Sequence, residues 1–395
     1  MVTLKIYSKK AIRGFTTIVI DNQLKIKLLK KMLTSIQLQH RFRNFKQKLF
    51  GIRVAVIGGY HGGNLGDMAL GESLITVLKN KKIKVGLQTI YNLNKWPKAK
   101  FAIIGGGAVG YNEPLNNVSI RYKGNYKNIA LLGVDFNEKV YTKDSIELMK
   151  TAAYISARNE EQAQRIMLIC GRQDVKFHPD IAFSLYQDYC AKQRQLKLKK
   201  LTKKFLVNIV PLYAKVVDGK IVSALRYETE RPELFKAFDQ MQLSYKKLLI
   251  DIIEDALSKG FEVETIPFTP LDEAYGKIIL EGLPVTHSKY HADPYKMVKK
   301  MSTAELILAT RYHATIFALK LGVPFYPIAY AVKNELLLQE LGISKANFIT
   351  STDLSVGYQT MKEPVTVDAE LISRWESKTS SVIEECINYI SQTSN

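Results

Sequence analysis

A glycine-rich loop between an apolar run and a helical pattern constrains the fold of this chain most strongly. The loop, residues 58–67, reads Gly-Gly-Tyr-His-Gly-Gly-Asn-Leu-Gly-Asp and follows the apolar run Arg53–Ile57. From Met68 to about Lys79, apolar side chains recur at helical spacing. Strand, glycine turn and helix in this order are typical of a doubly wound α/β domain. Backbone N–H groups of the turn would lie at the positive end of the helix dipole, so the loop is suited to bind an anion.

The glycine spacing of this loop matches neither the dinucleotide-binding pattern nor the P-loop pattern. The loop alone is therefore also consistent with a purely structural turn. Two polar side chains in it, Asn64 and Asp67, are aimed at the same turn. A functional interpretation gains weight from a second group of residues far downstream.

Arg311 and His313 form that second group, at the junction of a short strand and a helix. The apolar strand Leu306–Ala309 precedes them, and the helix ends at Gly322 with Pro324 beyond it. A guanidinium can bind a carboxylate or phosphate bidentately, and an imidazole can move a proton near neutral pH. The pair suits an acidic substrate. In the structural alternative, His313 caps the helix start and Arg311 pairs with a core carboxylate.

Strand and helix patterns alternate in two series, which predicts two Rossmann-like domains with parallel sheets. The first series contains the strands Phe101–Ile104, Ile129–Gly133 and Ala153–Ser156, and the second begins at Phe205–Val210. A length of 395 residues exceeds the usual size of one core, and an apolar content of 46% can bury two. Two such halves facing a cleft resemble the GT-B architecture of glycosyltransferases.

The expected organisation has five parts. They are a basic N-terminal extension at 1–50, a first Rossmann-like domain at 51–190, a basic linker at 191–204, a second Rossmann-like domain at 205–350, and 351–395, whose helix crosses back to the first domain. The linker holds seven basic residues and no acidic residue, glycine or proline. Its scattered leucines leave an exposed helix as the alternative.

Taken in order, these elements resemble the polysaccharide pyruvyl transferase family. Members carry a GN-x-GD loop near the start and an R-x-H element near the end, and both are present here. The resemblance covers about residues 53–342. The features between the two motifs are Ile104–Gly107, Ser156–Glu160, His178–Phe183, Pro327–Tyr330 and Lys333. One departure is that the middle element, usually Arg-Asp, reads Arg158-Asn159, which leaves Glu160 as a candidate for the missing carboxylate.

The resemblance implies transfer of a pyruvyl group from phosphoenolpyruvate to two hydroxyls of a sugar in a surface polysaccharide or its precursor. The product is a cyclic ketal, and phosphate is released. Such a reaction needs a proton donor, a base and cations that bind the donor's anionic groups. His313 is expected to be the acid or the base. Arg311 and Arg158 would bind the carboxylate and phosphate, with Lys333 as a further cation, although each arginine could instead form a structural ion pair.

Asp67 either takes a proton from the sugar or caps the helix that begins at Met68. The remaining candidates shape the site, where N–H groups would bind an acceptor hydroxyl or phosphate or line the cleft. They are Gly62, Gly63, Asn64, Gly66, Gly105, Gly106 and Gly107. The sequence shows no cluster of His, Cys and carboxylates typical of a metal site, so neither a metal nor a cofactor beyond the donor substrate is expected.

The charge of the chain is concentrated at its start. The formal net charge is +20, and residues 1–50 hold twelve Lys or Arg and one Asp. Apolar residues recur among these basic residues between Leu24 and Leu49, which suggests that residues 22–50 include a basic amphipathic helix suited to an anionic membrane surface. A solvated arm or a helix packed on the first domain is the alternative. Nucleic acid is not an expected partner, because zinc spacings and RNA-recognition signatures are absent from the sequence.

A cytoplasmic location, peripheral at the inner face of the membrane if residues 22–50 bind lipid, fits the remaining features. No run of 18 apolar residues occurs, and Met1–Ile20 is a poor signal peptide whose residues 15–20 look more like a strand. The three cysteines, Cys170, Cys190 and Cys386, are widely spaced and are expected to be buried, reduced thiols. Two other functions remain open: a GT-B-type nucleotide-sugar glycosyltransferase and a non-catalytic glycan-binding protein.

Overall fold

The computed structural model describes residues 38–136, 138–196, 203–360 and 363–392. It divides into two units, Met1–Phe50 and Gly51–Asn395. The first unit contributes a helix over residues 38–50. The strand expected at 15–20, the first part of the amphipathic segment at 22–37 and the linker residues 197–202 lie outside the described residues.

The first half of the unit Gly51–Asn395 is built on a six-stranded sheet of order β2-β1-β3-β4-β5-β6, in which every neighbouring pair is parallel. Its strands are β1 (Val54–Gly58), β2 (Val85–Thr89), β3 (Phe101–Gly107), β4 (Ile129–Val134), β5 (Tyr154–Ala157) and β6 (Lys176–Phe177). Its helices are α3 (Leu65–Asn80), α4 (Asn112–Arg121), α5 (Lys143–Thr151) and α6 (Glu160–Cys170). Short 3-10 turns η1 (Leu93–Lys95), η2 (Tyr126–Asn128) and η3 (Ile181–Ser184) join them.

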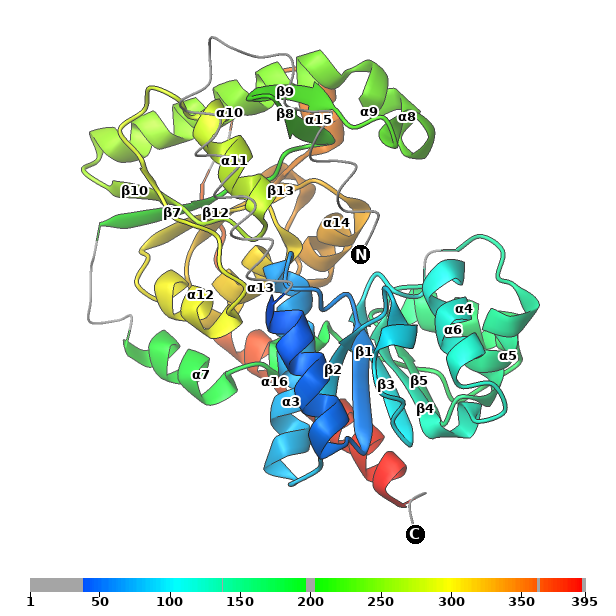
Figure 1. Cartoon of the computed structure of the whole chain (residues 1–395). Helices are drawn as coiled ribbons and strands as arrows, with labels where there is room; N and C mark the ends of the chain where they lie inside the picture. The colour runs from blue at the N-terminus through cyan, green and yellow to red at the C-terminus, as the bar shows by residue number, and fades with distance from the viewer. Residues whose placement is uncertain (1–37, 137, 197–202, 361–362, 393–395) are drawn as a thin grey trace. The chain divides into compact units, whose positions relative to one another are not determined.

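A second parallel six-stranded sheet has the order β11-β10-β7-β12-β13-β14. Its strands are β7 (Lys204–Asn208), β10 (Glu262–Thr265), β11 (Thr286–His287), β12 (Leu306–Ala309), β13 (Phe325–Ala329) and β14 (Ile349–Thr350). Its helices are α10 (Phe238–Ser258), α11 (Pro270–Ile279), α12 (Pro294–Met301), α13 (Tyr312–Leu321), α14 (Val332–Glu340) and α15 (Ser351–Val356). A hairpin of β8 (Ala214–Val217) and β9 (Lys220–Ser223) leads to α8 (Tyr227–Glu230) and α9 (Pro232–Lys236). Figure 1 shows both sheets with their helices.

The two parallel sheets confirm the predicted α/β class with two Rossmann-like halves. In each sheet the strand order reverses once, between β1 and β3 in the first and between β7 and β12 in the second. Ligands of open parallel sheets bind outside the carboxyl ends of the strands at such a switch point. The glycine loop follows β1, and Arg311 and His313 follow β12. Both motifs therefore lie where this topology favours a binding site.

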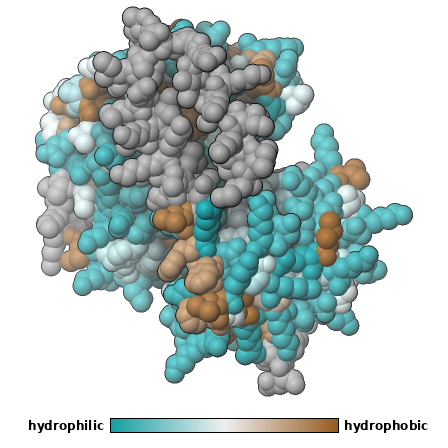
Figure 2. Space-filling view, viewed as in Figure 1, coloured by the Kyte–Doolittle hydropathy of each residue, from teal (hydrophilic) through white to brown (hydrophobic). Residues whose placement is uncertain are grey.

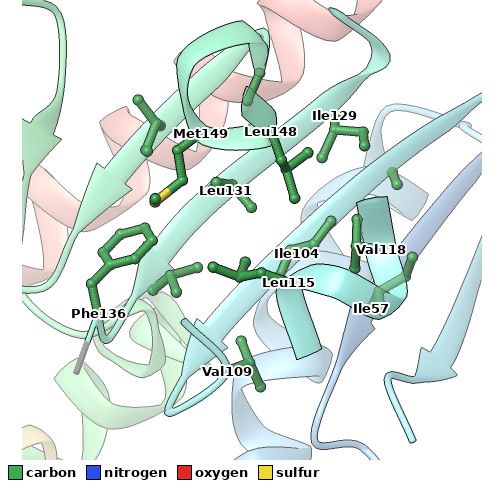
Figure 3. Packing of buried hydrophobic residues seen from close by; sticks show 14 of the residues in the cluster. Ile57, Ile104, Val109, Leu115, Val118, Ile129, Leu131, Phe136, Leu148 and Met149 are labelled. Atoms are coloured by element: carbon green, nitrogen blue, oxygen red, sulfur yellow. The ribbon is translucent and has the colours of Figure 1, made fainter. Parts of the chain in front are cut away.

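The strands of the first sheet read as continuous apolar runs because both faces of the sheet are covered. All residues of β1, β3 and β4 are buried. On one face, Ile57, Ile104 and Leu131 pack with Leu115 of α4 and Leu148 of α5 (Figure 3). This core holds the carboxyl ends of the strands in fixed positions.

Side chains of three helices, α7 (Gln187–Leu196), α13 and α16 (Ala369–Gln392), meet in a buried charge cluster that links the two sheets. Arg194 of α7 and Lys320 of α13 both contact Glu376 of α16, with Arg194 Nη2 at 2.8 Å from Oε2 and Lys320 Nζ at 2.8 Å from Oε1. Lys320 also donates to the carbonyl of Phe183 in η3. Burial lowers the pKa of Lys320, which is 1% exposed, while Glu376 opposes this shift. The helix that carries the second motif is thus tied to residues packed on the first sheet.

Candidate active site

The glycine loop is held between the two halves of the unit. The amide of Leu65 donates to the carbonyl of Phe268 at 2.9 Å, and the Tyr290 hydroxyl donates to the carbonyl of Gly62 at 2.6 Å. Gly62 has φ +80°, a conformation in which a side chain would be strained. Both outside contacts come from loops of the second sheet, so the position of the glycine loop depends on both halves.

Asn64, and not Asp67, caps helix α3. The Asn64 side chain accepts a hydrogen bond from the amide of Gly66 at 2.9 Å, and the helix begins at Leu65. The interpretation of Asp67 as the cap of a helix starting at Met68 is therefore wrong, because the helix starts one turn earlier. Asp67 accepts no hydrogen bond from any described residue. Burial raises the pKa of its carboxyl, and His313, Lys333 and the charges of other nearby groups oppose that rise.

Arg311 is committed to a carboxylate. Its Nε lies 3.1 Å from Asp272 Oδ2 and its Nη2 donates to Asp272 Oδ1, while the backbone amide donates to Asn208 Oδ1 at 2.7 Å. Although burial alone would lower it, the pKa of Arg311 is raised by the Asp272 carboxylate. The alternative interpretation of Arg311 as one half of a core ion pair is confirmed. Asp272 also closes the capping box of α11.

His313 lies in the first turn of α13, whose N-cap residue is Arg311, so the interpretation of His313 as the cap is wrong. The imidazole packs directly against the glycine loop: a Cβ placed on Gly66 would lie 2.2 Å from His313 Nδ1. On its other side, Nε2 is 3.8 Å from Oδ1 of Asp180. The two sequence motifs therefore meet, with a glycine at the one position where a side chain would displace the imidazole.

Arg158 lies in the same cluster, between two carboxylates. Its Nη1 is 3.1 Å from Asp180 Oδ2, and its Nη2 donates to Asp135 Oδ2. Burial would lower the pKa of Arg158, but Asp135, Tyr312 and Asp180 raise it above its usual value. The structural ion pair that was the alternative for this residue is present. Its guanidinium carbon also lies 5.3 Å from the centre of the Tyr312 ring, on the second half of the unit.

The departure at Asn159 has a local explanation. Its side chain caps α6 by accepting from the amide of Gln162 at 2.9 Å, a bond that Asp would make equally well. Glu160 is exposed, and its carboxylate accepts from Gln164 at 3.2 Å. Glu160 is therefore not placed to replace a carboxylate in the site, whereas Asp135 and Asp180 are.

A cavity of about 690 Å³ opens beside this cluster. Arg158, Asn159 and Tyr312 line it together with Lys333 at the start of α14. The Lys333 ammonium lies 5.3 Å from the centre of the Tyr312 ring. Lys333 belongs to the second half of the unit, whereas Arg158, which contacts the same ring, belongs to the first half. Among the described residues, no carboxylate lies within ion-pair distance of Lys333. The cavity has the size of a small-molecule site, and the Lys333 ammonium on its wall forms no ion pair with a described carboxylate.

The triple glycine has a packing role at the end of β3. A Cβ on Gly105 would lie 2.2 Å from Leu74 Cδ1, so its absence lets α3 pack closely on the strand. Gly106 and Gly107 have φ values of +64° and +79°. The next residue, Ala108, lines the cavity, and an added Cβ on Gly107 would lie 3.9 Å from Asp67 Oδ1.

The structure thus brings six of the predicted residues into one cluster: Gly66, Asp67, Gly107, Arg158, His313 and Lys333. Arg311 is bound to Asp272 instead, and its charge still acts on Asp67. Sequence reasoning missed Asp135 and Tyr312. Asp135 directly follows β4, and polar residues at the carboxyl ends of parallel strands could have identified it. Within the part of the chain that the structure describes, no group of three or more His, Cys, Asp or Glu is placed to hold a metal ion.

Solved structures resemble the chain only over loose superpositions. An uncharacterised protein from Klebsiella pneumoniae shares 14% identity and a TM-score of 0.40, covering 84% of this chain and 99% of its own. The UDP-GlcNAc 2-epimerase of Methanocaldococcus jannaschii shares 12% identity and a TM-score of 0.42, covering 85% and 99%. The Escherichia coli heptosyltransferase WaaC shares 10% identity and a TM-score of 0.31, covering 82% and 99%. The fold assignment therefore rests on the chain's own sheet order.

Comparison with curated protein sequences gives no match. A family model does match: that of the polysaccharide pyruvyl transferases aligns with residues 64–331, which is more than half of the chain. The matched segment begins in the glycine loop, contains Arg158, Arg311 and His313, and ends beside Lys333. On this ground the chain belongs to the polysaccharide pyruvyl transferase family.

Proposed function

We propose that this protein transfers the pyruvyl group of phosphoenolpyruvate to two hydroxyls of a sugar in a surface polysaccharide or its precursor. The single observation that carries the proposal is the meeting of His313 with the GN-x-GD loop beside a cavity that Lys333 and Arg158 line. An acid–base group and cations next to one cavity are what this reaction requires. Family membership supports the same chemistry.

The donor's two anionic groups would be bound by Lys333 and Arg158. Lys333 carries a charge that no described carboxylate neutralises within ion-pair distance, so it is assigned to the phosphate or carboxylate directly. Arg158 would exchange part of its contact with Asp135 or Asp180 for the donor. Arg311 is bound to Asp272, and its proposed contribution is its positive charge, which reaches the Asp67 carboxyl.

The proton transfers fall to His313 and Asp67. The methylene carbon of the enol takes a proton, which leaves a cationic centre at the adjacent carbon for the first sugar hydroxyl. That hydroxyl loses its proton as its oxygen bonds to this carbon. The carbon–oxygen bond to phosphate then breaks, with the electron pair leaving on the phosphate, and the second hydroxyl adds to the same carbon and loses its own proton to the base or the departing phosphate, which closes the ketal. His313 is assigned to proton transfer with the donor, and Asp67 to the sugar hydroxyl, since its raised pKa makes it a better base than an exposed Asp. Gly62, Gly63, Asn64 and Gly66 would shape this acceptor side.

The direct test is phosphate release from phosphoenolpyruvate by the purified full-length protein. Galactose, mannose, glucose and N-acetylhexosamine glycosides, free and lipid-linked, serve as acceptors. We expect release only with an acceptor, and a mass increase of the acceptor that corresponds to a pyruvyl ketal. Hydrolysis of a nucleotide sugar in place of phosphoenolpyruvate would favour the glycosyltransferase alternative. Glycan binding without turnover of either donor would favour a non-catalytic protein.

We further propose that the helix at 38–50 binds an anionic membrane surface. Leu38, Phe42, Phe45 and Leu49 recur at intervals of four, three and four residues and are 62–68% exposed. Such spacing places them on one face of a helix. Arg41, Arg43, Lys46 and Lys48 lie among them, and the segment has no acidic residue. Brown apolar residues are visible along this helix in Figure 2.

A basic helix with an exposed apolar stripe binds anionic lipids by combining burial of its apolar side chains with charge attraction. Such lipids lie in the cytoplasmic leaflet, where a lipid-linked sugar precursor would be met. Within the described residues, no helix is long and apolar enough to cross a bilayer. The proposed contact is therefore one in which the helix lies on the membrane surface.

Replacing Phe42 and Phe45 together by Asp is expected to weaken binding to phosphatidylglycerol-containing vesicles by roughly a hundredfold or more, because each buried Phe contributes about 1.5–3 kcal/mol. Flotation of the full chain measures this. Leu168→Asp is the matched control, since Leu168 is 86% exposed on α6, outside this helix. Equal flotation of the double variant and wild type, or no flotation of wild type, would contradict the proposal.

A further inference from the structure

His313 has charged or titratable neighbours on several elements. Asp180 precedes η3, Asp67 lies in the first turn of α3, Tyr312 precedes His313 in α13, and Arg158 follows β5. Some of these groups act on the imidazole itself and the others act on its charged neighbours. Together they are Asp180, Asp67, Tyr60, Tyr312, Arg158, Lys333 and Arg311. Among them, Asp180 is the carboxylate that lies on the Nε2 side of the ring.

Asp180 is buried and held in place by two other donors. It is 2% exposed, its Oδ2 accepts from Arg158 at 3.1 Å, and its Oδ1 accepts from the amide of Ala182 at 2.9 Å. Oδ1 is also the atom that lies 3.8 Å from His313 Nε2. That nitrogen is buried and makes no hydrogen bond with any described residue. A buried ring nitrogen without a partner, aimed at a fixed carboxylate, is uncommon unless the contact has a function.

We propose that Asp180 is a positioning residue for His313: its carboxylate orients the imidazole with Nε2 toward it and stabilises the protonated ring during proton transfer. This inference rests on the proposed function, in which His313 exchanges a proton with the donor. A hydrogen bond between Nε2 and Oδ1 requires this contact to shorten from 3.8 Å in the substrate complex. Nδ1, on the side of the glycine loop, is then the nitrogen that exchanges protons.

The chemistry of Asp180 fits this role. Burial alone would raise the pKa of its carboxyl, but His313, Arg158 and the Ala182 amide hold it below its usual range, so the group stays ionised. An ionised carboxylate about 4 Å from an imidazole favours the protonated form of the ring. The other histidine of this region, His178, is different: burial lowers its pKa to about 4, and both its nitrogens have partners, Ser156 Oγ at 3.0 Å and the Pro179 carbonyl at 2.7 Å. A neutral structural role suits His178.

Asp180→Asn tests the proposal, with Asp135→Asn as its matched control. Both substitutions remove one carboxylate from Arg158, but only Asp180 faces His313. Asn at 180 can still accept from the Ala182 amide, so the local turn is preserved. We expect kcat of Asp180→Asn to fall about tenfold to a hundredfold. We also expect the limb of its pH–rate profile that reports the imidazole to move to lower pH, whether His313 acts as acid or as base.

A second readout does not need activity. The His313 signal in an NMR titration of the imidazoles, assigned by its loss in His313→Gln, should move its midpoint to lower pH in Asp180→Asn and stay within a few tenths of a unit in Asp135→Asn. Equal midpoints in wild type and Asp180→Asn, or equal shifts in the two Asp variants, would overturn the proposal. If the titration shifts as expected but phosphoenolpyruvate is not consumed by wild type, the positioning contact stands and the proposed function fails.

Discussion

His313→Gln is expected to lower kcat for acceptor-dependent phosphate release by about 10²–10⁴-fold, the usual contribution of a positioned acid–base group. The imidazole of His313 packs against Gly66 of the glycine loop, and it lies within the segment shared with the family. Gln is of similar size and can donate and accept hydrogen bonds, but it cannot titrate near neutral pH. The loss should therefore appear in kcat more than in KM for phosphoenolpyruvate. Steady-state phosphate release measures both.

His287→Gln provides the matched control for this substitution. His287 lies in β11, the edge strand of the second sheet, and its Nδ1 is 3.1 Å from Thr265 Oγ1. It makes no contact with the residues of the site described above, so its replacement should leave turnover within about twofold, and circular dichroism should be unchanged in both variants. A His313→Gln enzyme that retained more than a tenth of wild-type kcat would exclude this residue as the acid or base.

The fold could be predicted because the strongest patterns are local. The apolar runs of β1 and β12 and the helices after them are marked by glycine, proline and apolar spacing within some twenty residues. The start of α3 could not be placed in the same way. Gly66 and Asp67 look like turn residues, but Asn64 caps the helix before them. Which of two adjacent polar residues caps a helix depends on the backbone conformation, which a pattern does not specify.

The candidate site was predictable where motif residues carry it and not where partners are distant. His313 and Gly66 come from different halves and meet because both motifs follow strands at switch points. The partner of Arg311 is Asp272, a residue that reads in the sequence as part of an ordinary helix start. Its contact depends on how the loop between β12 and α13 approaches the first turn of α11. The contact of Asp135 with Arg158 likewise depends on tertiary structure, because Asp135 follows β4 and Arg158 follows the neighbouring strand β5.

Removal of the Glu376 carboxylate is expected to destabilise the unit Gly51–Asn395 strongly. Glu376→Ala should lower the free energy of unfolding by about 3–5 kcal/mol, because it leaves the charges of Lys320 and Arg194 buried without their carboxylate. Glu376 is 5% exposed, so water cannot replace it cheaply. The loss also releases α13, which begins with Tyr312 and His313, from α16. A lower thermal midpoint and faster proteolysis at α16 are the expected measurements.

Glu385→Ala separates this effect from a general sensitivity of α16. Glu385 lies on the same helix and pairs with Lys176, but both side chains are nearly half exposed, so its loss should cost less than about 1 kcal/mol. Comparable destabilisation by Glu376→Ala and Glu385→Ala would show that α16 is sensitive to substitution in general. The buried charges of the cluster would then not explain the loss of stability. A large effect of Glu376→Ala alone, reduced when Lys320→Met is added, would assign the loss of stability to the buried ammonium that Glu376→Ala leaves uncompensated.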